Sequence, residues 1–238
     1  MRKRKISVCL ASYNGENYIE EQINSILCQL DNGDELIISD DSSTDNTVEI
    51  IKNLEDNRIV LLVDQKFKSP IFNFENALNY CNGDFIFLSD QDDKWRENKV
   101  EVTLKYLNDY DLVVSDCQII NENDEIINES FFALNGSKEG LLKNIVKNSY
   151  LGCCMAFKRR VLEKALPFPD LLPMHDWWLG LIGEIYYKTF FASEKLIYYR
   201  RHQNNASSTS DKSSNNIFKK LNFRIKMIWE LIRTIYKK

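Results

Sequence analysis

The feature that most constrains this chain is a short apolar run that ends abruptly in acids. Residues 85–88 are Phe-Ile-Phe-Leu, and Asp90, Asp92 and Asp93 follow close behind. An apolar run of this length, preceded by Gly83, indicates a buried strand of a parallel sheet. Ligands of open α/β sheets bind just beyond the carboxyl ends of the strands, which is where these acids would lie.

Three carboxylates this close together repel one another, so we expect a cation to hold them. A divalent metal that shares its coordination sphere with phosphate oxygens fits this charge pattern. The alternative is a helix N-cap, in which Asp90 or Asp92 caps a helix that begins near Trp95. Because a cap uses one acid rather than three, the sequence favours the metal.

The same order of strand and polar residues occurs earlier in the chain. Strands are predicted at residues 6–10, 34–39, 59–63 and 85–88, with helices at about 17–30, 48–54 and 73–80 between them. Elements that alternate in this way form βαβ units, so the predicted fold is α/β, with a Rossmann-like, mostly parallel sheet flanked by helices. Polar groups end three of these strands, at residues 12–14, 40–41 and 90–93. The ends of parallel strands share one edge of a sheet, so these groups should converge on one site.

Composition narrows the class of protein. A chain of 238 residues with 44% hydrophobic and 28% charged residues fits one large globular domain, with or without appendages. Its six cysteines form no CxxC pair and show no zinc-type spacing, which indicates reduced thiols and a cytoplasmic location. We expect no signal peptide and no nucleic-acid partner. We also expect no membrane-spanning helix, because no run approaches the roughly 18 apolar residues that one needs.

The usual phosphate-binding loops are missing from the sequence. No GxGxxG follows the first strand and no GxxxxGK[ST] occurs, which argues against an ordinary dinucleotide oxidoreductase and against a P-loop enzyme. A nucleotide held by Tyr13 as an aromatic platform, by Asp41 at the base or ribose and by a metal-bridged diphosphate stays open. The alternative for Tyr13 and the two residues after it is a plain turn.

Three segments together resemble the family 2 glycosyltransferases of the GT-A fold. They are SVCLASYNGENYIEEQINSIL, ELIISDDSSTDNT and GDFIFLSDQDDKW, and the last resembles the metal motif SDQDD-x-W of the rhamnosyltransferase-like branch. The resemblance covers about residues 6–205. It implies a GT-A glycosyltransferase domain over residues 1–205, with a nucleotide-binding half at 1–116 and an acceptor half at 117–205.

For the nucleotide, the resemblance implies contacts from two loops. Ala11, Tyr13 and Asn14, together with Glu16, would line the pocket for the nucleobase. Asp41 would contact the uracil or thymine and its ribose. Many relatives carry threonine or proline where this chain has Ala11, which removes a hydroxyl contact without abolishing binding.

For the metal, the resemblance implies that Asp90 and Asp92 form the DxD pair. Asp92 would be the more direct ligand of Mg²⁺ or Mn²⁺, and Asp90 would serve both the metal and the nucleotide. His202 would complete the metal site or contact the diphosphate, whose charge Arg200 or Arg201 would offset. The alternative is that this last segment is a solvated loop.

On the acceptor side, the pair His175-Asp176 stands where the family carries an acid-containing motif. Asp176 would be the general base that takes the proton from the acceptor hydroxyl, and its alternative role is a helix N-cap. Trp177 and Trp178 follow directly and offer flat apolar faces to a sugar. At least one of them should pack into the core, as tryptophans in helices usually do.

Further contacts with sugar or acceptor are expected at Trp95, Gly152 and Arg201. Gly152 lies in a predicted strand of small residues at 150–157, where a sugar could approach the backbone closely; simple tight packing is the alternative. The remaining predicted elements are helices at 95–107, 139–146 and 175–186, strands at 112–116 and 195–199, and a short hairpin at 119–120 and 126–127.

The end of the chain differs in charge from the rest. Residues 206–215 are a predicted polar linker. Residues 216–238 are a predicted basic amphipathic helix with seven lysines or arginines and one acid, whereas the whole chain has a net charge of −4. This helix could lie on an anionic membrane surface. The alternatives are that it folds back on the catalytic domain or forms a homodimer.

These observations predict a metal-dependent inverting glycosyltransferase. It would move rhamnose or another hexose from a UDP- or dTDP-sugar to a cell-surface polysaccharide or lipid-linked glycan, in the cytoplasm or at the inner face of the cell membrane. One alternative, a sugar nucleotidyltransferase, would want a basic Gly-rich loop after the first strand, which residues 11–16 lack. The other, a non-catalytic carbohydrate-binding module, would have no need of Asp176 together with the acids at 90–93.

Overall fold

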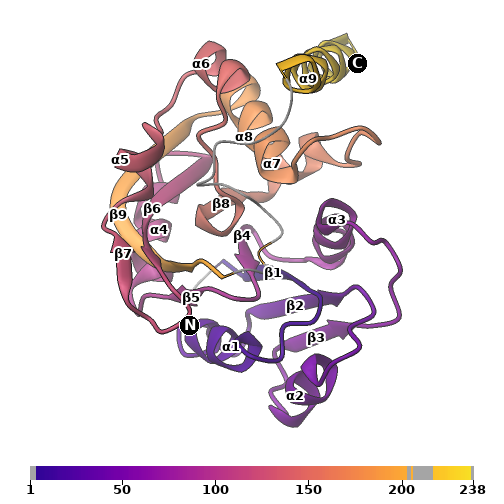
Figure 1. Cartoon of the computed structure of the whole chain (residues 1–238), viewed down its shortest axis with the longest axis vertical. Helices are drawn as coiled ribbons and strands as arrows, with labels where there is room; N and C mark the ends of the chain where they lie inside the picture. The colour runs from indigo at the N-terminus through magenta and orange to yellow at the C-terminus, as the bar shows by residue number, and fades with distance from the viewer. Residues whose placement is uncertain (1–3, 203–204, 206–216, 237–238) are drawn as a thin grey trace.

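One mixed sheet runs through the protein in the computed structural model, which describes residues 4–202, 205 and 217–236 (Figure 1). The strand order is β3-β2-β1-β4-β8-β6-β9-β5, and β7 pairs with β6. The strands are β1 (Ile6–Ser12), β2 (Glu35–Asp40), β3 (Ile59–Leu62), β4 (Phe85–Asp90), β5 (Lys94–Trp95), β6 (Leu112–Ile120), β7 (Ile126–Asn128), β8 (Met155–Lys158) and β9 (Thr189–Arg200). The helices are α1 (Ile19–Leu27), α2 (Thr47–Asn53), α3 (Pro70–Tyr80), α4 (Lys99–Leu107), α5 (Phe131–Asn135), α6 (Leu141–Val146), α7 (Arg159–Ala165), α8 (His175–Tyr186) and α9 (Ile217–Tyr236). The predicted polar linker at 206–215 lies outside the described residues.

The first half of the sheet is parallel. β1 lies between β2 and β4, and all three strands run in the same direction. They are near-continuous apolar runs because helices and loops cover both faces of a sheet of this kind. The register pairs Ser12 with Asp40 and Ala11 with Asp90, so the polar ends of the strands meet at one edge. The predicted convergence of the strand ends is confirmed.

The second half of the sheet is mixed. β8 is antiparallel to both β4 and β6, β9 is parallel to β6, and β5 is antiparallel to β9. α3 packs on β1 and β2, and α8 packs against α7 and β9 (Figure 1). The predicted α/β class, with a sheet flanked by helices and a helix near the end of the chain, is therefore confirmed.

The sequence predicted that a helix begins at Trp95, and this prediction is wrong. It lies in β5 and pairs with Ile197 of β9, and α4 begins only at Lys99. The ring of Trp95 is buried, with its centroid 5.7 Å from that of Phe87. The pairing with β9 places this residue in the sheet, with its ring in the core.

The predicted strand at 150–157 is also wrong in its first part. A single 3-10 turn, η1 (Gly152–Cys154), precedes β8, so the chain turns beside the site before it enters the sheet. β9 begins at Thr189 rather than at residue 195, because its first residues pair with β6. The helix α7 was not predicted from the sequence.

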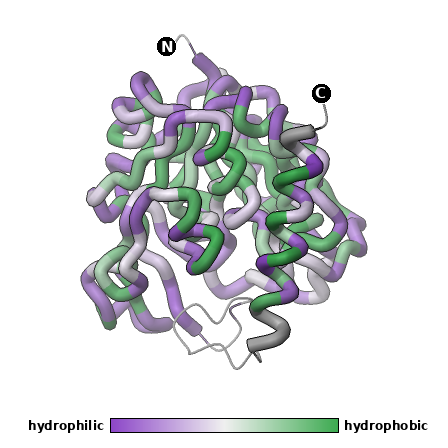
Figure 2. The backbone as a smooth tube through the Cα atoms, turned by 90° about the horizontal axis from the view of Figure 1, so that it is seen from above, coloured by the Kyte–Doolittle hydropathy of each residue, from purple (hydrophilic) through white to green (hydrophobic). Residues whose placement is uncertain are grey.

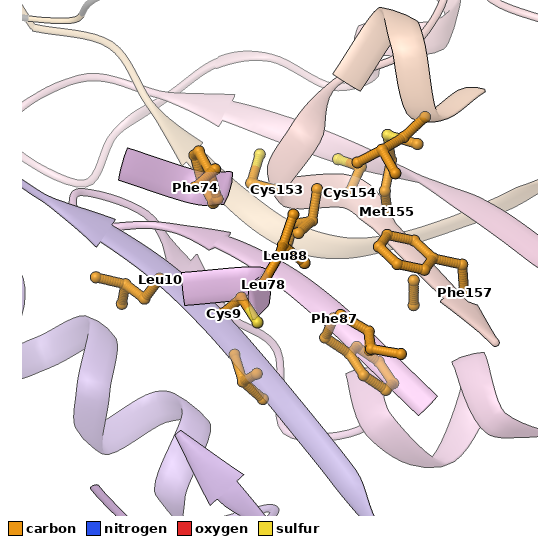
Figure 3. Close-up of a cluster of buried hydrophobic side chains, with 14 of the residues drawn as sticks. Cys9, Leu10, Phe74, Leu78, Phe87, Leu88, Cys153, Cys154, Met155 and Phe157 are labelled. Atoms are coloured by element: carbon orange, nitrogen blue, oxygen red, sulfur yellow. The ribbon is translucent and has the colours of Figure 1, made fainter. Parts of the chain in front are cut away.

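The core lies where the two halves of the sheet meet. Figure 3 shows side chains from β1, β4, β8 and α3 in one cluster, among them Leu10, Phe74, Phe87 and Phe157. Cysteines 9, 153 and 154 are buried in the same cluster, where their sulfur atoms pack as small apolar groups. All six cysteines are free thiols.

Gly83→Ala should destabilise the fold, because a Cβ at this position would lie 2.5 Å from the backbone nitrogen of Ser7 in β1. A strand backbone cannot move aside cheaply, so we expect the free energy of unfolding to fall by about 1–3 kcal/mol. Gly33→Ala is the matched control, since a Cβ there meets nothing within 4 Å and should be neutral or slightly stabilising. Chemical denaturation measures both variants, and equal stabilities would contradict the packing described here.

Candidate active site

The loops that follow β1 and β2 are joined by side chains. The side-chain oxygen of Asn14 accepts a hydrogen bond from the backbone N–H of Thr44 at 2.8 Å. The carboxylate of Glu16 accepts from the backbone N–H of Asn46 at 3.0 Å and from its side-chain amide at 2.7 Å. Asn14 also adopts a left-handed backbone conformation, with φ of 49°. Both side chains therefore hold the shape of this loop pair, and their contact with a nucleobase stays a prediction.

Tyr13 is displayed by the first loop, with 55% of its surface exposed. Its backbone is held by Gln91, whose side chain accepts from the Tyr13 N–H at 2.8 Å and donates to the Tyr13 carbonyl at 3.0 Å. Gly15 leaves room for this contact, since a Cβ there would lie 2.4 Å from Oε1 of Gln91. Sequence reasoning missed Gln91, although its place between the acids of the motif was a usable signal.

Asp41 is engaged by the chain that follows β3. Its carboxylate accepts from the backbone N–H of Phe67 at 2.6 Å and from that of Ser69 at 3.3 Å. These bonds fix the carboxylate at the rim of the β2 end, where it is nearly buried. Its contact with base and ribose stays a prediction, as does that of Ala11, which pairs with Asp90 in the sheet.

The loop after β4 meets the segment after β9. Nε2 of His202 lies 2.8 Å from Oδ2 of Asp92, and the side-chain amide of Asn205 donates to the same oxygen at 2.9 Å. The His202 ring stacks on Tyr18, with ring centroids 5.1 Å apart. The fold thus brings together two residues that are 110 positions apart in the sequence and that the predicted metal site had paired.

Arg200 holds the loop after β4 from inside the protein; we call this loop, residues 90–93, the acid loop. Its backbone N–H donates to Oδ1 of Asp93 at 3.0 Å, and its Nε donates to the carbonyl of Asp92 at 3.0 Å. Its guanidinium also pairs with Glu21 of α1 at 2.9 Å and with Asp124. Only 2% of Arg200 is exposed. Arg200 is therefore a structural cation, which corrects its prediction as a counter-charge for the diphosphate.

Asp93 is the most deeply buried acid of the loop. Its surface is fully covered, and its Oδ2 has no hydrogen-bond partner among the described residues. Burial, and then the charges of Asp92 and Asp90, raise the pKa of Asp93 well above its ordinary value. Lys99 is buried nearby, where its amino group donates to the carbonyl of Cys153 at 3.1 Å and burial lowers its pKa. Neither Asp93 nor Lys99 has a separate role in the prediction from the sequence.

A divalent metal has two candidate positions among the described residues. Asp90, Asp93 and Cys153 bring three ligand atoms within 4.8 Å of one another. Burial raises the pKa of the Cys153 thiol well above its ordinary value, and a protonated thiol is a poor ligand for Mg²⁺ or Mn²⁺. Asp92 and His202 supply an oxygen and a nitrogen 2.8 Å apart, and His202 lines a cavity that opens beside them. This second pair therefore fits the predicted ion better.

Asp176 lies in the first turn of α8, near the acid loop. Burial raises its pKa to about 7, although the N–H groups of Trp177 and Gly152 and the side chain of Asn148 donate to it. Burial is also the main reason that the pKa of Asp90 rises to about 8, and the charge of Asp176 contributes to that rise. A carboxylate that ionises near neutral pH is suited to accept a proton during a reaction.

His175 and Gly152 are packed together beside Asp176. A Cβ on Gly152 would lie 2.9 Å from Nε2 of His175. The His175 ring stacks on Phe74 at 4.2 Å, and neither ring nitrogen has a hydrogen-bond partner among the residues that the structure describes. Burial lowers its pKa to about 3, so the ring is neutral. This contact accounts for a glycine at 152 by tight packing, the alternative that the sequence left open.

The three tryptophans that were expected to contact a sugar lie in the core. Trp95, Trp177 and Trp178 have exposed fractions of 3%, 9% and 1%. The indole N–H of Trp177 donates to the carbonyl of Asn144 at 2.7 Å, and that of Trp178 donates to Ala165 at 2.9 Å. None of the three presents a ring face to solvent, which corrects the predicted sugar contacts. The inward packing expected for at least one of them is confirmed for both tryptophans of α8.

A cavity of about 340 Å³ opens beside His202. Arg201 lines it together with residues 121–123, which are Asn-Glu-Asn. The backbone N–H of Arg201 donates to the carbonyl of Ile120 at 2.8 Å, which places its side chain at the cavity rather than in the core. A polar lining of this kind suits a hydroxylated ligand, and the sugar contact of Arg201 stays a prediction.

Comparisons with known proteins identify the family. The family model described as Glycosyl transferase family 2 matches residues 7–166. The Escherichia coli UDP-Glc:alpha-D-GlcNAc-diphosphoundecaprenol beta-1,3-glucosyltransferase WfgD is 31% identical over 178 residues, which cover 74% of this chain and 68% of that protein. The Campylobacter jejuni GalNAc(5)-diNAcBac-PP-undecaprenol beta-1,3-glucosyltransferase is 29% identical over 67% of this chain and 53% of that protein. The matched region thus spans about half to two thirds of these relatives.

Solved structures share the fold. S. aureus TarS in complex with UDP-GlcNAc aligns with a TM-score of 0.73 at 20% identity, covering 98% of this chain and 67% of TarS. The mannosyltransferase PcManGT from Pyrobaculum calidifontis, in complex with GDP-Man and Mn²⁺, aligns with a TM-score of 0.63 at 16% identity, covering 98% of this chain and 65% of the other. These structures confirm the predicted GT-A fold, and the family model covers more than half of the sequence. The chain therefore belongs to glycosyl transferase family 2.

Proposed function

We propose that this family 2 glycosyltransferase is a metal-dependent, inverting enzyme that transfers a hexose from a UDP-sugar to a lipid-linked glycan. The observation that carries the proposal is the meeting of two groups of residues at one sheet edge. Asp92 and His202 lie 2.8 Å apart on one side, and Asp176, with a pKa of about 7, lies near the same loop. One group suits a leaving diphosphate and the other an attacking hydroxyl. A carbohydrate-binding module would need neither.

The donor nucleotide would lie over the ends of β1 and β2. Gln91 holds the backbone of Tyr13, and the exposed ring is available to stack on a base. Asp41 stands at the rim of the same region, fixed by two backbone N–H groups. UDP-Glc appears in the name of the E. coli relative and UDP-GlcNAc in that of the TarS complex, which supports UDP as the nucleotide. The motif resemblance to rhamnosyltransferases has no such support, so we favour another hexose over rhamnose.

Asp92 and His202 would hold Mg²⁺ or Mn²⁺, with Asp90 beside them. When bound, the ion supplies positive charge next to the departing diphosphate. The chain keeps this position ready, because Arg200 holds the backbone of Asp92 and Asn205 holds its carboxylate. The PcManGT structure in complex with Mn²⁺ is a precedent for such an ion in this fold.

Asp176 would act on the acceptor. Inversion requires that the hydroxyl attacks from the face opposite the diphosphate and gives up its proton as the new C–O bond forms. The N–H groups of Trp177 and Gly152 hold the carboxylate in one orientation. The neutral ring of His175 adds no positive charge that would weaken the base. Burial therefore makes Asp176 a stronger base than an exposed aspartate.

A lipid-linked acceptor is supported by the relatives from E. coli and C. jejuni, whose names contain undecaprenol diphosphate glycans. We place the enzyme in the cytoplasm, at the inner face of the cell membrane, where such acceptors would be reached. No helix among the described residues is both long and apolar enough to cross a membrane. Within this proposal, residues 1–116 serve the nucleotide and residues 117–205 serve the acceptor.

Asp92→Asn should lower turnover by roughly 10²-fold or more, because the change removes the charge of a metal ligand. Release of UDP from UDP-glucose, with Mn²⁺ or Mg²⁺ and again after EDTA, measures the effect. Asp109→Asn, an exposed acid after α4, is the matched control and should keep full activity. Full activity of Asp92→Asn, together with a wild type that EDTA does not inhibit, would contradict the metal dependence.

Asp176→Asn should reduce transfer by roughly 10²–10⁴-fold while UDP-sugar affinity is unchanged, because the amide keeps the side chain's size and cannot take a proton. Calorimetric titration with UDP separates the two effects. The same variant should melt at a higher temperature at pH 8 than the wild type. Since burial raises the pKa of Asp176 in the fold, its ionisation lowers the free energy of unfolding as the pH rises from about 4 to about 7. A matching loss of UDP affinity would make Asp176 a binding residue.

The transfer rate should fall as the pH falls through about 7, since only the ionised Asp176 can accept a proton. Between pH 8 and pH 6 the ionised fraction would drop from about nine tenths to about one tenth. A profile of kcat/KM against pH tests this, with UDP affinity followed over the same range. A rate that stays flat down to pH 5 would show that a carboxylate with an ordinary pKa, or no carboxylate, is the base.

A further inference from the structure

An apolar surface that no other described residue covers lies at one end of the molecule, across α6 and α9. Figure 1 shows these two helices together at the top, and Figure 2 looks down on that end, with apolar residues along α9. We call this surface the apolar patch. It comprises residues with exposed fractions of 42–80%: Leu142, Val146, Leu221, Ile225, Trp229 and Ile232. Four of them recur at helical spacing along α9, the other two lie on α6, and the two helices pack together. Exposed apolar residues that gather in this way mark an interaction site more often than single ones do.

Over its described side chains, residues 221–234, α9 is apolar on two faces, and the domain covers one of them. Met227 and Leu231 are buried against the domain, and Arg224 donates through Nε to the carbonyl of Val146 at 3.0 Å. Packing on α6 is therefore complete without the second face, on which Ile225 and Trp229 are 57% and 62% exposed. Folding back on the domain, one of the alternatives from the sequence, explains why the face with Met227 and Leu231 is apolar. It does not explain the exposed apolar face with Ile225 and Trp229.

The patch is bordered by positive charge. Three lysines lie around α6: Lys138, Lys143 and Lys147. Burial, and then the charges of Lys138 and Lys147, lower the pKa of Lys143, so these amino groups lie near one another. Residues 137–148 and 221–234 together hold six basic and two acidic side chains, although the whole chain has a net charge of −4. One of the two acids, Glu230, pairs with Arg233. Exposed apolar side chains with a basic border are what an anionic bilayer surface binds.

The patch is built into the acceptor side of the active site. The indole of Trp177, the residue after the base Asp176, donates to the carbonyl of Asn144 in α6 at 2.7 Å. α9 in turn packs on α6. The apolar patch is therefore connected to Asp176, the proposed base, through α6 and Trp177.

We propose that the apolar patch is a membrane-docking surface that seats the enzyme on an anionic lipid bilayer. Leu142, Ile225 and Trp229 would enter the boundary between headgroups and acyl chains, while the lysines around α6 contact the anionic headgroups. A second copy of this chain is the poorer occupant, because a two-fold dimer would press the same positive border against itself. The purpose of docking, access to a lipid-linked acceptor, rests on the proposed function; the docking itself does not.

Sedimentation of the full chain with vesicles tests the proposal, without donor or acceptor present. Vesicles of phosphatidylcholine with phosphatidylglycerol should bind the protein, vesicles of phosphatidylcholine alone should bind it far less, and high salt should weaken the binding. Ile225→Ser with Trp229→Ser should lower the partition coefficient at least about tenfold. Ile127→Ser, an equally exposed isoleucine in β7, is its matched control and should have no effect.

A charge variant separates the electrostatic contribution. Lys138→Gln with Lys226→Gln should weaken binding to anionic vesicles by about fivefold for each charge removed. Lys105→Gln, an exposed lysine of α4, should leave it unchanged. The emission of Trp229, the one tryptophan of the chain that is exposed, should shift to the blue and resist quenching once vesicles are added.

Binding that is absent, or that survives the Ile225/Trp229 change, would overturn the proposal. So would a dimer, detected by light scattering, that the same change dissociates, since the patch would then be a subunit interface. Thermal melting of each variant without vesicles shows that it is folded. Because vesicle binding is measured without catalysis, its failure is distinguishable from failure of the glycosyltransferase assay.

Discussion

The candidate active site depends on one buried guanidinium. Arg200 stands at the end of β9 and joins α1 through Glu21, the turn after β6 through Asp124, and the acid loop through the backbone of Asp92. A buried cation is costly unless it is paired and hydrogen-bonded, so these contacts together keep Arg200 in place. Together they hold three mutually repelling carboxylates in one loop and place the strand end so that His202, two residues later, reaches Asp92.

The same loop is electrostatically unfavourable in the protein alone. Asp93 is buried with one oxygen that has no partner among the described residues, and burial raises the pKa values of Asp90 and Asp176 to about 8 and about 7. Groups perturbed in this way gather where chemistry occurs, because a carboxylate that is easily ionised is a weak base. Buried carboxylates therefore destabilise the fold at the carboxyl ends of the strands, and the apolar core where β1, β4 and β8 meet offsets this loss.

Much of the first half of the fold could be predicted, because strands buried on both faces form uninterrupted apolar runs that end where the sheet ends. β5 could not be predicted, because it depends on pairing with β9, which is distant in sequence. The turn at Gly152 could not be predicted either, because it packs against His175. At the site, the family motif paired Asp92 with His202. It could not show that Arg200 and Trp178 face inward, because charge and aromatic character do not reveal which way a side chain points; tertiary packing decides that.

The central claim is that the meeting of the acid loop with His202 is a metal site that serves a nucleotide diphosphate. Anomalous diffraction from crystals soaked with Mn²⁺ and UDP tests it most directly. We expect one strong manganese peak in contact with Asp92 and His202, with the uridine beside Tyr13. A peak only among Asp90, Asp93 and Cys153, or no peak while Asp92 and His202 remain 2.8 Å apart, would contradict it.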